Sequence, residues 1–129
     1  MENAADDILF MEEQIPYNIS HRCFHFSKCI ILFVANVEFG SVYYSLFDQL
    51  IRSATSIGAN AVEESSGSSK KDFINFYSIA LKSANETKYW LCLIRDTMNC
   101  DKSRVTELLS EADQISKIIA SIIESAKVG

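Results

Sequence analysis

The chain has 129 residues, of which 48% are hydrophobic and 22% are charged, and it contains four glycines and one proline. This composition is typical of one globular domain, rather than two domains or a disordered tail. Twelve basic and 17 acidic side chains give a formal charge of −5. Because so few glycines and prolines leave little material for the many turns of a β-sandwich, the composition favours a helical protein.

The net charge belongs to the N-terminus. Residues 1–15 contain no lysine or arginine, and their acidic side chains are Glu2, Asp6, Asp7, Glu12 and Glu13. Removing these five from the 17 acidic residues leaves 12, which equals the number of basic residues. We therefore expect an acidic N-terminal arm, residues 1–17, and an electrically neutral domain, residues 18–129. The acidic composition does not exclude a nucleic-acid partner for that domain.

The sequence lacks the patterns of secreted and membrane proteins. Its start has no positively charged region followed by an apolar one, as a secretory signal requires. The longest wholly apolar run, residues 29–35, is far shorter than the roughly 20 residues that span a bilayer. We expect a cytoplasmic protein with no membrane partner, whose cysteines are reduced. These are Cys23, Cys29, Cys92 and Cys100.

Two stretches in the first half have apolar residues at the spacing of three and four that is typical of helices. The first predicted helix covers residues 20–39 and ends at Gly40. The second covers residues 42–64 and has one continuous apolar face. It should end in the serine- and glycine-rich residues 65–68, because short polar side chains compete for backbone hydrogen bonds.

Two more helices are predicted in the second half. The third follows Ser69, a favourable N-cap with Asp72 three residues later, and extends to residue 96. The fourth covers residues 103–127. Because short loops join antiparallel neighbours, four such helices predict an all-α, up-down-up-down four-helix bundle. The third helix has more apolar circumference than a single buried face needs.

The residues for metal or nucleophilic chemistry are sparse. A ferritin-like di-iron site needs a Glu-x-x-His pair on each of two helices, whereas the only histidines are His21 and His25. Together with Cys29 they lie along one side of a helix, and three ligands on one helix do not easily surround zinc. We interpret them as a histidine pair beside a buried cysteine. Nucleophilic catalysis also lacks a recognisable base and orienting acid, so we expect no enzyme activity, no metal and no cofactor.

The start of the third helix is the strongest candidate for an anion site. Residues 65–71 read SSGSSKK, and a serine- and glycine-rich turn before a helix N-terminus presents free N–H groups to a phosphate. Ser69, Lys70 and Lys71 are the candidate contacts there, with Arg52 on the second helix as a further one. Ordinary helix capping by Ser69 explains most of the same pattern, so both interpretations stay open.

A longer pattern resembles a known bacterial family. Residues 49–60 read QLIRSATSIGAN, Glu63 follows, residues 69–73 read SKKDF, and residues 79–91 read IALKSANETKYWL. This pattern is similar to the 23S rRNA-intervening sequence proteins, whose signature is Gln-Leu-x-Arg-(Ser/Ala)-x-x-Ser-Ile-x-x-Asn followed by Glu and then Ser-x-x-(Asp/Glu)-Phe. The polar residues that carry the resemblance are Gln49, Arg52, Asn60, Glu63 and Glu86.

The resemblance implies a cytoplasmic, non-enzymatic four-helix bundle that assembles into a ring, a pentamer, with no established role. A related accessory protein of diversity-generating retroelements is a basic pentamer that binds nucleic acid and a reverse transcriptase. Here Gly67 and Ser68 stand where many members carry two arginines, which weakens the case for nucleic-acid binding. We expect Asn60 and Glu63 to form structural hydrogen bonds near the turn between the second and third helices.

Two functional hypotheses follow. In the first, the chain is an assembly protein whose excess apolar surface on the first and third helices is buried between copies, because soluble monomers seldom expose large apolar patches. In the second, it is an accessory factor that binds RNA or DNA through a basic face of the ring. The residues for that face are Arg52, Lys70, Lys71, Lys82 and Lys88.

Overall fold

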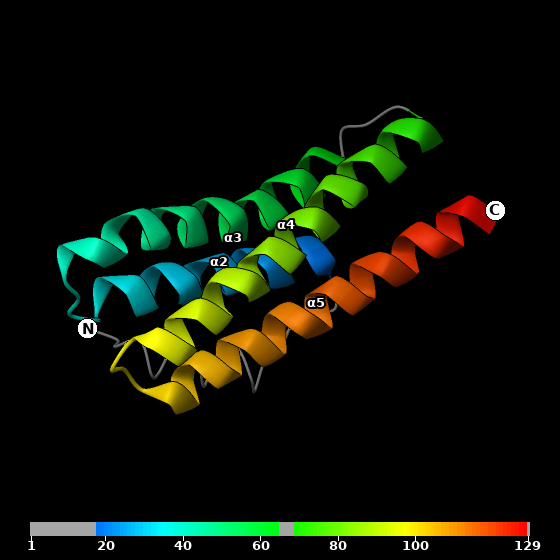
Figure 1. The fold of residues 1–129 in the computed structure, drawn as a ribbon. Coiled ribbons are helices and arrows are strands. Elements are labelled where there is room, and N and C mark those ends of the chain that lie inside the picture. Colours follow the sequence, from blue (N-terminus) through cyan, green and yellow to red (C-terminus); the bar gives the residue numbers. More distant parts are fainter. Residues whose placement is uncertain (1–17, 65–68, 129) are drawn as a thin grey trace.

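The computed structural model describes residues 18–64 and 69–128. The predicted acidic arm and the loop residues 65–68 lie outside these described residues. Within them the chain forms four long α-helices and one short 3₁₀ turn, in the order α2, η1, α3, α4 and α5. Figure 1 shows the helices alternating in direction along the bundle. The predicted all-α, up-down-up-down four-helix bundle is confirmed.

The first helix, α2, covers Ile19–Ala35 and is shorter than predicted. The side chain of Asn18 caps its start, because Oδ1 accepts hydrogen bonds from the amides of Ser20 and His21. Asn36 ends it four residues before Gly40: its side-chain Nδ2 donates to the carbonyl of Leu32 at 2.8 Å. The sequence periodicity continued beyond this residue, but a local hydrogen bond of this kind competes with the helix.

The next two helices confirm the pattern of the middle of the chain. The turn η1 covers Ser41–Tyr43 and leads into α3, which covers Tyr44–Glu64. Helix α4 covers Lys70–Thr97. The predicted N-cap of α4 is confirmed, because the Ser69 side chain accepts a hydrogen bond from the Asp72 amide at 3.1 Å.

Helix α5 covers Lys102–Val128. Asp101 precedes it, and its Oδ1 accepts hydrogen bonds from the amides of Ser103 and Arg104. The sequence analysis did not predict this N-cap, although aspartate is a favoured residue at that position. It explains why α5 begins one residue earlier than the apolar pattern predicts.

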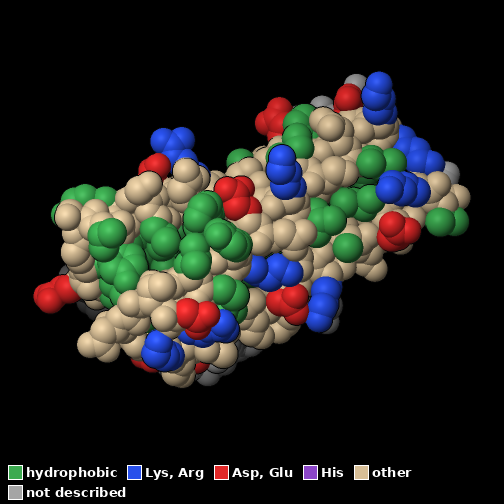
Figure 2. All heavy atoms as spheres, viewed as in Figure 1, with side chains coloured by type: hydrophobic (Ala, Val, Ile, Leu, Met, Phe, Trp, Pro, Cys, Tyr) green, Lys and Arg blue, Asp and Glu red, His purple; other side chains and the backbone are tan. Residues whose placement is uncertain are grey.

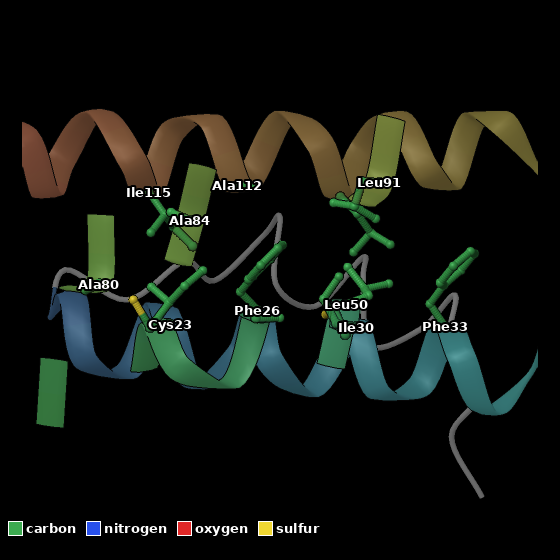
Figure 3. Packing of buried hydrophobic residues seen from close by; sticks show 14 of the residues in the cluster. Cys23, Phe26, Ile30, Phe33, Leu50, Ala80, Ala84, Leu91, Ala112 and Ile115 are labelled. Carbon is green, nitrogen blue, oxygen red and sulfur yellow. The ribbon is translucent and has the colours of Figure 1, made fainter. Parts of the chain in front are cut away.

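The helices pack as a closed square in which each contacts its neighbours in sequence and α5 returns to α2. All four contribute apolar side chains to one core, and Figure 3 shows them meeting between the helices. Phe26 and Ile30 of α2, Leu50 of α3 and Leu91 of α4 are fully buried there. No helix in the described part of the chain is long and apolar enough to cross a membrane.

Candidate interaction surfaces

An apolar groove of about 680 Å³ lies between α2 and α3. Its walls include Phe24 and Ile31 of α2 and Val62 of α3, whose side chains are 66%, 45% and 56% exposed. Gly58 lies in the same groove, and a Cβ added there would be 3.4 Å from the Cβ of Cys23. The small residue therefore lets the two helices approach closely, with large apolar side chains left at the surface on either side. We call this surface the α2/α3 groove.

A second apolar surface lies on α4. Tyr89 is 58% exposed, and Trp90 and Leu93 are half-buried beside it. Ile79, about 15 Å earlier on α4, is 40% exposed. Figure 2 shows apolar side chains gathered over the C-terminal half of this helix. Among the described helices α2 does not contact α4, so the α4 surface and the α2/α3 groove are separate faces of one molecule.

A buried ion pair joins α2 to α5. The guanidinium of Arg22 donates two hydrogen bonds to the Glu111 carboxylate, from Nε at 2.8 Å and from Nη2 at 2.7 Å, and a third to Gln114 at 2.9 Å. The hydrogen bond to Glu111 raises the pKa of Arg22, and burial raises the pKa of the neighbouring Cys23 thiol to about 12. A bidentate pair of this kind fixes the register of two helices.

Small hydroxyl side chains fill the contact between α3 and α4. Thr87 donates to Ser53 at 2.9 Å, and Ser83 donates to Ser56 at 2.9 Å. Thr87 is completely buried, and Ser53 and Ser83 are nearly so. The four residues form a satisfied polar ladder instead of a reactive centre, because each oxygen has a partner within the helix pair. All four lie within the sequence stretches that carry the family resemblance.

The polar residues singled out by the resemblance do not form one site. Arg52 is exposed and pairs with Asp48 one turn earlier, at 2.8 Å. Asn60 donates to the carbonyl and hydroxyl of Ser56 at 2.8 and 3.1 Å, one turn earlier within α3 and not at the turn between the second and third helices, where its bonds were expected. The others are exposed along α3 and α4: Gln49, Glu63 and Glu86.

The candidate anion contacts are also dispersed. Ser69, Lys70 and Lys71 are exposed at the start of α4, and Ser69 acts as the N-cap. Arg52 lies 12 residues before Glu64, the last residue of α3, which is about 18 Å along a helix axis. Arg52 is therefore distant from the three residues at the start of α4.

The histidines and Cys29 do not form a metal site. His21 is exposed, His25 is half-buried and Cys29 is buried, at three levels along one side of α2. Within residues 18–64 and 69–128, no group of three or more His, Cys, Asp or Glu side chains is placed to hold a metal ion.

Comparison with known proteins identifies the family. The model of the 23S rRNA-intervening sequence proteins matches residues 17–121. This chain belongs to the 23S rRNA-intervening sequence protein family. A crystal structure from Bacteroides thetaiotaomicron, of a protein of unknown function from the S23 ribosomal protein family, is similar over 81% of this chain and 97% of its own. The TM-score is 0.75 and the sequence identity is 33%. No curated protein matches the chain significantly.

The family match covers most of the chain but not its two ends. It includes α2, α3, α4 and most of α5, so the bundle is the part shared with the 23S rRNA-intervening sequence proteins. Residues 1–16 and the last turns of α5, from residue 122, lie outside the matched range.

Proposed function

We propose that the chain is a non-enzymatic assembly protein that binds copies of itself. The observation that carries this proposal is the presence of large exposed apolar side chains on two separate faces, the α2/α3 groove and the α4 surface. Soluble monomers rarely expose contiguous apolar surface of this kind. A partner that covers it would remove the side chains from water and stabilise the complex by about 25 cal/mol per Å² of apolar surface buried.

The position of the two faces favours a ring. If the α2/α3 groove of one copy receives the α4 surface of the next, each contact joins two different surfaces, which is a heterologous interface. Such contacts form a closed ring when the rotation between copies closes, or a filament when it does not. We propose the closed form, and the family resemblance favours five copies.

The proposal can be tested by placing a charge in the groove. Phe24→Asp should leave the helical content unchanged, because the side chain is 66% exposed, but should shift sedimentation to the mass of one chain. Val42→Asp is the matched control, since Val42 is 82% exposed and lies outside the groove, on η1. If Phe24→Asp and the control both sediment as the unchanged protein does, the α2/α3 groove is not the contact.

A nucleic-acid role has less support than assembly. Arg52 pairs with Asp48, and Lys88 pairs with Asp113 at 3.2 Å. Lys70 and Lys71 lie at the start of α4, distant from both pairs along the bundle. Assembly could still gather such residues on one face of a ring. Deleting residues 1–15 removes five negative charges per copy and should strengthen RNA binding at low salt if that face exists.

We also propose that the assembly protein is located in the cytoplasm.

A further inference from the structure

Helix α5 is much longer than the helix that should cover it. Helix α5 has 27 residues and α2 has 17. The bonds from Arg22 to Glu111 and Gln114 fix their antiparallel register, so the start of α2 at Ile19 lies opposite residues 114–117. The following residues of α5, about 15 Å of helix, have no α2 beside them. Figure 1 shows the last turns of α5 and the first turns of α4 extending past the start of α2.

This missing corner of the bundle is an apolar groove of about 750 Å³. It is lined by Phe73 of α4 and by Ile118, Ile122 and Ala126 of α5. These three residues of α5 follow one another every four positions, which places them on one side of the helix. Upstream of residue 118, the same corner of the bundle is filled by α2. We call this surface the α4/α5 groove.

The chain itself supplies a segment of suitable composition at this corner. Residues 8–11 read ILFM and are flanked by Asp6 and Asp7 on one side and by Glu12 and Glu13 on the other. Asn18 precedes α2 directly, so the chain enters the bundle at the end where the α4/α5 groove opens. The seven residues from residue 11 to residue 18 can span about 23 Å when extended, which exceeds the roughly 15 Å of α5 that extends past the start of α2.

Four lysines lie around the groove. Lys117 lines the groove, Lys70 and Lys71 begin α4, and Lys127 ends α5. Against these four cations stand Asp72 and Glu124 in the same turns, Asp113, which pairs with Lys117 at 2.9 Å, and Glu63 at the adjacent end of α3, so positive and negative side chains balance around the groove. Lys70, Lys71 and Lys127, at the helix ends, are the cations that the acidic flanks of residues 8–11 can meet. Both the segment and the end of the groove also lie outside the family match, which ends at residue 121.

We propose that residues 8–11 dock in the α4/α5 groove of the same chain and complete the fourth corner of the bundle. The apolar side chains cover Phe73, Ile118 and Ile122, and the acidic flanks face the lysines at the helix ends. Attachment to α2 gives the segment a high effective concentration at its own groove, which favours it over the same segment of another copy.

Hydrogen exchange of the full chain tests this docking. The variant Leu9→Ser with Phe10→Ser removes the two largest apolar groups of the segment, and Ala4→Ser with Ala5→Ser is the matched control in the same arm. The first variant should speed amide exchange at residues 118–126 by about tenfold, whereas the control should leave it unchanged. Exchange in α3 should not change in either protein.

Equal exchange at residues 118–126 in the unchanged chain and in Leu9→Ser with Phe10→Ser would overturn the proposal. A second measurement decides between the same chain and another copy. Protection at residues 118–126 should stay constant when the protein is diluted a hundredfold below its assembly concentration. Protection that disappears on dilution would show that the segment comes from another copy, and this would also overturn the proposal as stated.

Discussion

Arg22 and Glu111 show what a single buried contact contributes. Their side chains are 12% and 6% exposed, so truncating one partner leaves the other charge buried without compensation. We predict that Glu111→Ala lowers the free energy of unfolding by about 3 kcal/mol. Replacing both partners, with Arg22→Met and Glu111→Leu, should recover most of this loss. Urea unfolding followed by circular dichroism measures both effects.

The control for this prediction is an exposed pair of similar geometry. Arg52 and Asp48 are 73% and 59% exposed, and Asp48→Ala should change the free energy of unfolding by less than about 0.5 kcal/mol. If Glu111→Ala costs no more than Asp48→Ala, the pair between α2 and α5 does not fix their register, and the missing corner of the bundle loses its main geometric support.

The cysteines should differ in reactivity. Cys23 is completely buried, and burial raises its pKa to about 12 from 9.0, whereas Cys92 and Cys100 are half-buried. Because the thiolate is the reactive form, a thiol reagent at pH 8 should modify Cys92 and Cys100 well before Cys23. Mass spectrometry of the labelled peptides gives the order, and equal rates at the three residues would contradict this packing.

The same pKa has a consequence for stability. Between about pH 9 and pH 12 the unfolded chain releases the Cys23 proton while the folded chain keeps it. Stability therefore falls as pH rises through this range. In Cys23→Ala the decline of the unfolding free energy over the same range should be shallower than in the unchanged protein.

Among the elements, the four helices and the ends of α3 and α4 were predictable, whereas the end of α2 and the start of α5 were not. Periodicity located all four helices, because burial of one face depends on residues three and four apart. Asn36 ended α2 and Asp101 began α5 through local side-chain bonds, which periodicity does not report. Phe24 and the fully buried Phe26 are two residues apart and point to opposite sides of α2, but the sequence does not say whether a partner covers the side that carries Phe24.

The candidate sites were less predictable than the fold. Arg22 and Glu111 are separated by 89 residues, and only the three-dimensional packing brings them together. The resemblance located the stretch that contains Ser53, Ser56 and Ser83, but not its role as a hydrogen-bonded ladder. Both cases depend on contacts between helices, whereas sequence patterns describe each helix alone.

The hydroxyl ladder predicts a narrow contact between α3 and α4. Thr87→Val keeps the shape of the side chain and loses its hydrogen bonds, so it should cost about 1 kcal/mol of stability. Thr87→Leu also adds volume where Ser53 already contacts the side chain, and should cost about 3 kcal/mol. Thermal unfolding of the two variants measures the difference. If Leu is tolerated as well as Val, the two helices are not closely packed here.

In the whole bundle, as far as residues 18–64 and 69–128 describe it, three apolar surfaces lie at the boundary: the α2/α3 groove, the α4 surface and the α4/α5 groove. The first two lie on separate faces and suit contacts between copies. The third lies where the chain enters the bundle and suits a segment of the same chain. None of these surfaces contributes to the hydrophobic core, whose residues are already fully buried within the bundle: Phe26, Ile30, Leu50 and Leu91. These surfaces therefore indicate interactions beyond the fold of residues 18–128.

Static light scattering of the full chain at micromolar concentration measures self-assembly. We predict a mass of at least two 14.5 kDa chains, with five copies as the number that the family resemblance favours. The mass should stay constant over a tenfold range of concentration, because a closed ring has a fixed number of members. A mass of 14.5 kDa throughout that range would contradict it.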